Sequence, residues 1–198
     1  MADDETLRFY AENARTYAAR ERRLPHVELA AFLAALPPGA PILELGSGGG
    51  QDALAMQEAG FAVTASDASP ALAAEAERRL GRPVRVMRFD ELDDEAAYAG
   101  VWASASLLHA PRAELTGILG RIWRALRPDG LFVASFKAGS AEGRDRFGRF
   151  YNYLDAPTLL DHYRAAGSWQ HLDVREQAGS GYDGVPTDWL WVTARRMP

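Results

Sequence analysis

The chain contains no cysteine. This absence excludes a disulfide framework, a thiolate metal site and a cysteine nucleophile. The four histidines do not stand at the spacings of a metal-binding motif either, so no metal is expected.

Long apolar stretches and an excess of basic residues are also missing. No window approaches 18 uninterrupted apolar residues, so no membrane-spanning segment is expected. Residues 1–23 are charged throughout and lack the apolar run of a secretory signal, which makes a cytoplasmic location the default expectation. The chain has 22 Lys and Arg against 27 Asp and Glu, and this net charge of −5 does not favour binding to nucleic acid or to acidic membranes.

What the chain does have is the size and composition of one folded domain. Its 198 residues correspond to about one domain at roughly 150 residues per domain. The hydrophobic fraction of 47% and the charged fraction of 25% are ordinary for a globular protein. We therefore expect a single domain over residues 1–198.

Short β-type segments alternate with longer helical segments through most of the chain. The β-type segments are rich in Val, Ile and aromatic residues and are bounded by Gly or Pro; they lie at residues 42–45, 61–66, 84–89, 100–104 and 130–136. Helical patterns occupy residues 4–22, 26–36, 52–59, 71–80 and 112–127. This alternation predicts an α/β fold with a parallel sheet covered by helices on both faces.

The C-terminal part follows a different pattern. Residues 157–166 read as a helix, and residues 169–177 and 188–195 read as two strands joined by a Gly-rich loop. These two strands should pair as an antiparallel hairpin, because only that loop separates them. Residues 138–152 form the longest irregular segment, and long loops at a sheet's edge are often functional.

A glycine-rich turn carries the strongest functional signal. The run Glu44-Leu45-Gly46-Ser47-Gly48-Gly49-Gly50 follows the first predicted strand and opens a helix. Glycine allows the chain to turn sharply and lets a ligand approach the main chain, and the helix start adds unpaired N–H groups. A dinucleotide fingerprint would need glycine at position 51, where this chain has Gln51. The observed acidic-x-Gly-x-Gly-x-Gly pattern instead resembles the first motif of the class I methyltransferases that use S-adenosylmethionine (SAM).

Acidic residues follow the next two predicted strands. Asp67 ends the second strand, 21 residues after Gly46, and one carboxylate there can accept both ribose hydroxyls. NAD enzymes use the same position, so Asp67 alone does not separate the two cofactors. The resemblance implies that Asp90 contacts the adenine amino group while Phe89 packs on the ring. The predicted cofactor site comprises Glu44, Gly46, Gly48, Gly50, Asp67, Ala68, Phe89, Asp90, Glu91 and Ala105.

The segment that follows extends this resemblance. Residues 100–111 look like the fourth-strand region of the small-molecule methyltransferases, and residues 112–131 resemble the helix and turn that come after it. The resemblance implies a Rossmann-like seven-stranded sheet in the order 3-2-1-4-5-7-6, with the seventh strand antiparallel. It also divides the domain into a helical lid (residues 1–37), a cofactor-binding core (40–137) and a substrate-side loop with the terminal hairpin (138–198).

The expected reaction is in-line transfer of a methyl group from SAM to a small-molecule acceptor. Holding the acceptor in line with the S–CH₃ bond contributes roughly 7–11 kcal/mol in favourable cases. His109 lies just past the fourth strand and is the candidate general base, since imidazole titrates near neutral pH. A packing role for this histidine is the alternative.

Aromatic and basic residues outside the core complete the predicted site. Similar enzymes cover the cofactor with a leading helix, and Tyr10 and Tyr17 share one face of such a helix here. Simple packing of that helix on the sheet is equally compatible with the pattern. In the loop after the fifth strand, Arg146, Arg149 and Tyr151 suit an anionic or aromatic substrate, although the loop could also be merely solvated.

Two other functions remain open at this stage. A non-catalytic SAM-binding sensor would keep the same glycine turn and acids. An NAD(P)-dependent oxidoreductase would share the α/β frame, but Gln51 and the lack of a Tyr-x-x-x-Lys pair disfavour it. In the enzymes that this chain resembles, an Asn/Asp-Pro-Pro-Tyr/Phe motif after the fourth strand serves the planar amino groups of adenine or glutamine, and this chain lacks it. A nucleic-acid acceptor is therefore disfavoured, but nucleic-acid and protein acceptors stay open as alternatives. The pattern does not identify the acceptor or the methylated atom.

Overall fold

The computed structural model describes residues 3–20 and 27–198. Within these residues, the main sheet has seven strands in the order β3-β2-β1-β4-β5-β9-β8. The strands are β1 (Pro41–Leu45), β2 (Ala62–Asp67), β3 (Arg85–Val86), β4 (Tyr98–Ala103), β5 (Leu126–Lys137), β8 (Trp169–Ser180) and β9 (Pro186–Arg196). Strands β1 to β5 are parallel, whereas β9 is antiparallel to both β5 and β8. The predicted sheet order and the terminal hairpin are therefore confirmed.

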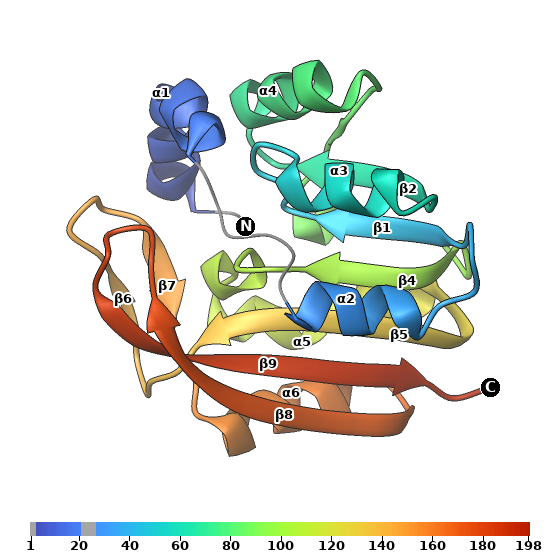
Figure 1. Cartoon of the computed structure of the whole chain (residues 1–198). Coiled ribbons are helices and arrows are strands. Elements are labelled where there is room, and N and C mark those ends of the chain that lie inside the picture. The colour runs from blue at the N-terminus through green and yellow to red at the C-terminus, as the bar shows by residue number, and fades with distance from the viewer. Residues whose placement is uncertain (1–2, 21–26) are drawn as a thin grey trace.

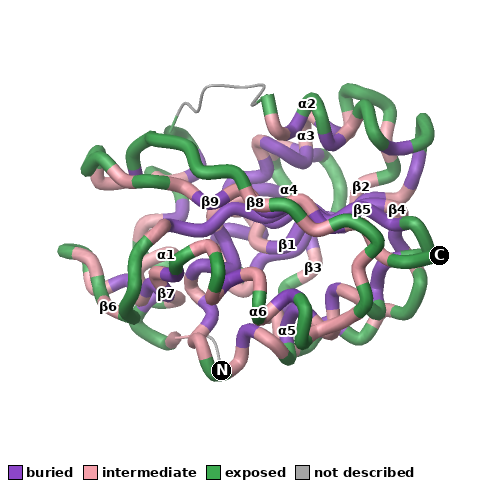
Figure 2. The backbone as a smooth tube through the Cα atoms, turned by 90° about the horizontal axis from the view of Figure 1, so that it is seen from below, coloured by how far each residue is buried: buried purple, intermediate pink, exposed green. Residues whose placement is uncertain are grey.

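Helices cover both faces of this sheet (Figure 1). Helices α2 (Val27–Ala34) and α3 (Gln51–Glu58) lie on one face, and α5 (Arg112–Ala125) and α6 (Ala156–Ala166) lie on the other (Figures 1 and 2). Helix α4 (Pro70–Leu80) packs beside β2, and α1 (Asp4–Ala19) contacts α4 near the carboxyl ends of the parallel strands. The predicted helix end at Arg22 and helix start at His26 lie outside the described residues. None of the described helices is long and apolar enough to cross a membrane.

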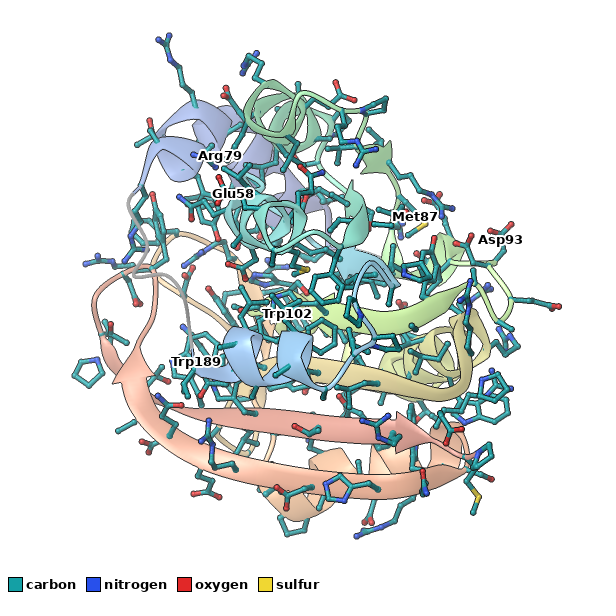
Figure 3. The ribbon with its side chains drawn as sticks, turned by 45° about the vertical axis from the view of Figure 1, so that its right-hand side comes forward. Glu58, Arg79, Met87, Asp93, Trp102 and Trp189 are labelled. Atoms are coloured by element: carbon teal, nitrogen blue, oxygen red, sulfur yellow. The ribbon has the colours of Figure 1, made fainter. Side chains whose placement is uncertain are left out.

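Two apolar layers fix the sheet between its helices. Figure 2 shows that the central strands of the sheet are largely buried. On the α2 side, the fully buried Trp102 packs on Phe32 with ring centroids 5.2 Å apart (Figure 3). The indole Nε1 of Trp102 donates a 3.0 Å hydrogen bond to Asp52, so this buried polar group is satisfied. On the α5 side, apolar residues at helical spacing share one face and are buried, namely Leu115, Ile118, Leu119 and Ile122.

The third strand is shorter than predicted. Only Arg85–Val86 pairs with β2, and Phe89–Glu91 forms a 3-10 turn instead of extending the strand. The Glu91 carboxylate accepts the Arg88 backbone N–H at 2.8 Å, and this local bond competes with strand pairing. The third and fourth strands are therefore connected by a turn that begins at Phe89.

The segment predicted to be irregular contains a small hairpin. Strands β6 (Glu142–Arg144) and β7 (Phe150–Asn152) pair antiparallel beside α1. The Asp145 carboxylate accepts the backbone N–H groups of Phe147 at 2.9 Å and Arg149 at 3.0 Å, which turns the chain between the two strands. The expectation of an irregular loop over 138–152 is wrong for this reason.

Candidate functional site

Two adjoining cavities open at the carboxyl ends of the parallel strands, beneath α1. One has a volume of about 70 Å³ and the other about 550 Å³. Ligands of open α/β sheets bind at this edge. The residues that line both cavities are Tyr10, Tyr17, Gly46, Gly48, Ala105 and His109. The structure thus brings together the predicted glycine turn, lid tyrosines and candidate base.

The glycine turn between β1 and α3 is shaped by left-handed backbone. Gly46 has a φ of +76°, and a Cβ added to it would lie 2.4 Å from Cβ of Ser106. The hydroxyl of Ser47 on this turn is buried, lines the larger cavity and has no hydrogen-bond partner within the described chain. A ligand with a polar group at this point would satisfy that hydroxyl. Gly50 lies outside both linings and allows α3 to pack on α4.

Asp67 ends β2 with its carboxylate on the smaller cavity. Its two oxygens accept the backbone N–H groups of Gly48 and Ser69, each at 2.8 Å. An ionised carboxylate has about four acceptor positions, so two remain for a ligand's hydroxyls. Burial raises the pKa of Asp67 to about 6, and the two N–H bonds offset only part of this cost. Ala68 and Phe89 line the same cavity.

Three other acids predicted for the cofactor site lie outside both linings. Asp90 pairs with Nε of Arg88 at 3.2 Å, and Glu91 is exposed and closes the 3-10 turn. Glu44 is buried in β1, so its side chain points into the protein interior. The structure does not bring these three carboxylates into the lining of either cavity.

His109 is held between Tyr10 and the main chain. Its Nδ1 lies 2.5 Å from the Phe150 carbonyl oxygen, so Nδ1 carries the ring proton. Nε2 therefore accepts, and the Tyr10 hydroxyl donates to it at 2.9 Å. Nη1 of Arg149 in turn donates to the Tyr10 oxygen at 3.3 Å. Burial lowers the pKa of His109 to about 4, which leaves the imidazole neutral at pH 7.

The two arginines predicted to bind substrate differ in position. Arg149 is 1% exposed and forms a 2.6 Å ion pair with Asp145, which compensates its charge. Its guanidinium also lies near five aromatic rings, at 4.9–5.8 Å, from Phe9, Tyr10, Phe147, Tyr151 and Tyr182. Arg146 is exposed, donates to the Asp183 carbonyl at 3.1 Å and lies outside both linings. Tyr151 lines the larger cavity.

Helix α1 is fastened over the cavities by polar contacts at its start. The Asp3 carboxylate caps the helix at Thr6 and accepts two hydrogen bonds from Arg144, at 2.9 and 2.6 Å. The Phe150 N–H donates to the Thr6 hydroxyl at 2.8 Å. The Tyr17 ring stacks on Tyr182 of the β8–β9 loop with centroids 5.3 Å apart. Contacts from both the small hairpin and the terminal hairpin thus hold α1 in place.

Removing the Arg144 side chain should loosen this cover. Arg144→Met is expected to speed backbone amide exchange in α1 several-fold and to leave α5 unchanged, as measured by hydrogen–deuterium exchange. The hydrogen bond from Arg144 lowers the pKa of Asp3 to about 2. Because that pKa is lowered, the ion pair between Asp3 and Arg144 stabilises the fold above about pH 4, and this stabilisation is lost as the pH falls toward 2. Arg164→Met, which removes an exposed i,i+3 pair on α6, is the control, and an unchanged α1 would contradict the assignment.

Some cavity residues were not predicted from the sequence. Ser47 lies on the glycine turn after β1, and the others come from the end of β5, the β8–β9 loop and β9, namely Ser135, Lys137, Tyr182, Trp189 and Trp191. Trp189 and Trp191 are two apart in a strand and therefore share a face, and this alternation was an available signal. Ala105 holds a φ of +52° and donates its N–H to the Ser135 hydroxyl at 2.8 Å. No sequence pattern marks such a strained residue. In the part of the chain that the structure describes, no group of three or more His, Asp or Glu could hold a metal ion.

Comparisons with known proteins show which family and fold this chain shares. A family profile described as a methyltransferase domain matches residues 42–130. The 1,6-didemethyltoxoflavin-N1-methyltransferase of Burkholderia thailandensis, crystallised with 1,6-didemethyltoxoflavin and S-adenosylhomocysteine (SAH), is 30% identical over 86% of this chain and 76% of its own, with a TM-score of 0.67. Magnesium protoporphyrin IX methyltransferase from Synechocystis PCC 6803, solved with SAM, is 17% identical over 99% of this chain and 98% of its own, with a TM-score of 0.69.

A third structure shares the fold over most of this chain. The phosphoethanolamine N-methyltransferase 2 of Haemonchus contortus is 15% identical over 96% of this chain and 59% of its own, with a TM-score of 0.74. No curated protein sequence matches the chain.

Proposed function

The chain belongs to the SAM-dependent methyltransferases and transfers a methyl group from SAM to a small molecule; on that premise we propose that the acceptor is aromatic and binds in the larger cavity. The composition of the cavity wall carries this proposal. Aromatic side chains project into it from α1, β7, the β8–β9 loop and β9, namely Tyr10, Tyr17, Tyr151, Tyr182, Trp189 and Trp191. Such rings stack on flat ligands and exclude water.

The proposed cofactor position follows from the smaller cavity and the glycine turn. The two free acceptor positions of Asp67 would bind the ribose hydroxyls, and Ala68 and Phe89 would pack on the adenine ring. The methionine end would reach the main chain of Gly46 and Gly48 and the free hydroxyl of Ser47, under Tyr10 and Tyr17. Roles for Glu44, Asp90 and Glu91 in cofactor binding stay predictions.

SAM, when bound, supplies an electrophilic methyl group on a sulfonium. The chain's own residues then align the acceptor, exclude water and receive its proton. The neutral His109 is suited to this last role, because Nε2 already accepts from the Tyr10 hydroxyl. We propose a relay in which the Tyr10 oxygen takes the acceptor's proton while its own proton passes to Nε2. Arg149 keeps the Tyr10 hydroxyl oriented.

Removing the imidazole should slow turnover without loosening the cofactor. His109→Ala is expected to lower kcat about 100-fold, the lower end of general-base effects, while the Kd of SAM changes less than about threefold. Because the pKa of His109 is about 4, wild-type kcat at saturating SAM should be flat from pH 5 to 8 and fall as the pH drops through 4. The rate of SAH formation measures kcat and its pH dependence, and titration with SAM measures the Kd. His171→Ala, an exposed position on β8, is the control. Full activity of His109→Ala would remove the base assignment.

A direct screen tests the acceptor class. SAH formation should rise with phenols, aromatic acids and nitrogen heterocycles but not with aliphatic amines of the same size. Turnover restricted to aliphatic acceptors would overturn the proposal.

The remaining assignments belong to the same proposal. Residues 1–37 would cover the site, residues 40–137 would hold the cofactor and residues 138–198 would complete the acceptor side. A cytoplasmic location and the exclusion of nucleic-acid acceptors stay predictions; cell fractionation and the same activity screen test them.

A further inference from the structure

Lys137 is the only lysine of the chain, since the other 21 of its 22 basic residues are arginines. It is the last residue of β5, at the carboxyl end of that strand, and pairs in register with Trp189 on β9. Its side chain is 5% exposed and lines the larger cavity. The lysine therefore lies where the aromatic acceptor is proposed to bind.

The ammonium group of Lys137 has no anionic partner in the described chain. No carboxylate there forms an ion pair with Nζ and no acceptor there receives a hydrogen bond from it, whereas the Tyr151 ring lies under it at 4.3 Å. Asp183 is the nearer of two carboxylates that act on the ammonium group, since Oδ1 of Asp183 and Nζ of Lys137 lie 2.7 and 2.8 Å from the same point, the Cβ position of Gly181, but the two groups form no ion pair. The second carboxylate, Asp145, is paired with Arg149. Burial lowers the pKa of Lys137, and the charge of Asp183 offsets only part of this effect.

The surrounding chain keeps space around this group. A Cβ added at Gly181 on the β8–β9 loop would lie 2.8 Å from Nζ. Glycine at this position therefore leaves room for the ammonium group. The other buried cation of the cavity, Arg149, is already compensated by Asp145. An unpaired buried charge is costly, and a ligand anion would offset that cost.

We propose that Lys137 selects acceptors with an anionic oxygen, such as a carboxylate or an ionised phenol or enol on an aromatic ring, by forming an ion pair with it in the larger cavity. This inference rests on the proposed aromatic acceptor. A compact ammonium on a flexible stem suits a single oxygen better than the forked guanidinium used elsewhere in the chain.

A pair of nearly isosteric probes tests the selection. Titration calorimetry of the full chain saturated with SAH would compare 2-naphthoate with 2-naphthamide at pH 7.5. Wild type should bind the carboxylate at least about tenfold more tightly, and Lys137→Met should reduce that preference to less than about twofold. Arg164→Met, which removes a positive charge on the surface of α6, should keep the full preference.

The outcomes separate this inference from the proposed function. If wild type binds SAH but neither 2-naphthoate nor 2-naphthamide, the proposal of an aromatic acceptor is wrong, and the proposal that Lys137 selects the acceptor is wrong as well. If both probes bind equally, or if Lys137→Met keeps the preference, the aromatic acceptor stands and the lysine proposal is overturned. Binding of SAH by Lys137→Met within about threefold of wild type shows that the variant is folded.

A second readout needs no variant. Because the chain has one lysine, acetic anhydride can modify only the Lys137 amine among the lysine side chains, and mass spectrometry reports its rate. Saturating 2-naphthoate should slow this acetylation at least about tenfold, whereas 2-naphthamide should slow it less than about twofold. Equal protection by both probes, or by neither, would overturn the ion pair.

Discussion

Gly46→Ala is expected to abolish SAM binding, with an affinity loss of at least about 1,000-fold, and to destabilise the fold. The left-handed backbone at φ +76° costs an alanine about 1–2 kcal/mol. The new Cβ would also lie 2.4 Å from Cβ of Ser106, so the glycine turn or the start of the 3-10 turn after β4 must move. That overlap lowers the free energy of unfolding by about a further 1–3 kcal/mol. Both segments line the cavities, so the displacement also changes the cofactor site.

Gly81→Ala is the matched control for this prediction. Gly81 ends α4 with a φ of +63°, but nothing lies within 4 Å of an added Cβ. The Gly81→Ala variant should therefore lose only the stability that the left-handed backbone costs an alanine, about 1 kcal/mol, and keep the SAM affinity of wild type. Denaturant unfolding and titration with SAM measure the two effects. Comparable affinities for Gly46→Ala and Gly81→Ala would show that the glycine turn does not hold the cofactor.

Asp67→Ala is the second change with a large expected effect. Two hydrogen bonds from a ribose to one carboxylate contribute together about 4 kcal/mol, so the Kd of SAM should rise about 1,000-fold. The carboxylate also orients the Gly48 and Ser69 N–H groups, which would lose their acceptor. Asp93→Ala, an exposed acid well separated from Trp189 in Figure 3, should leave the affinity unchanged. Equal SAM binding by both variants would remove Asp67 from the site.

The raised pKa of Asp67 makes affinity and stability change with pH in opposite directions. Wild-type SAM affinity should fall as the pH drops below about 6, because protonation removes the charged acceptor. Without cofactor, the folded state binds this proton more tightly than the unfolded chain does. The stabilisation of the folded state by protonated Asp67 is thus present below about pH 4 and is lost as the pH rises through 6. The rise of the Asp67 pKa from its ordinary value of 3.8 to about 6 corresponds to roughly 3 kcal/mol. Asp67→Ala should flatten both profiles, measured by calorimetry and denaturant unfolding.

The sequence predicted the frame of the site because local signals and chain order agree there. The glycine turn, the acid at the end of the second strand and the β–α alternation are each determined by neighbouring residues, and parallel strands bring their carboxyl ends to one edge. The terminal hairpin was also predicted correctly, because two strands joined by a short loop usually pair with each other. These features need only a few residues of context.

The three-dimensional packing decided which side chains reach the cavities. Arg146 and Arg149 lie three apart in one predicted loop, yet the turn at Asp145 buries only Arg149. Asp90 and Glu91 are held beside the shortened third strand by bonds to Arg88. Lys137, Tyr182 and Trp189 approach the glycine turn from chain segments that are distant in the sequence. Burial, charge pairing and the direction of a side chain depend on such distant contacts, so sequence position alone could not predict them.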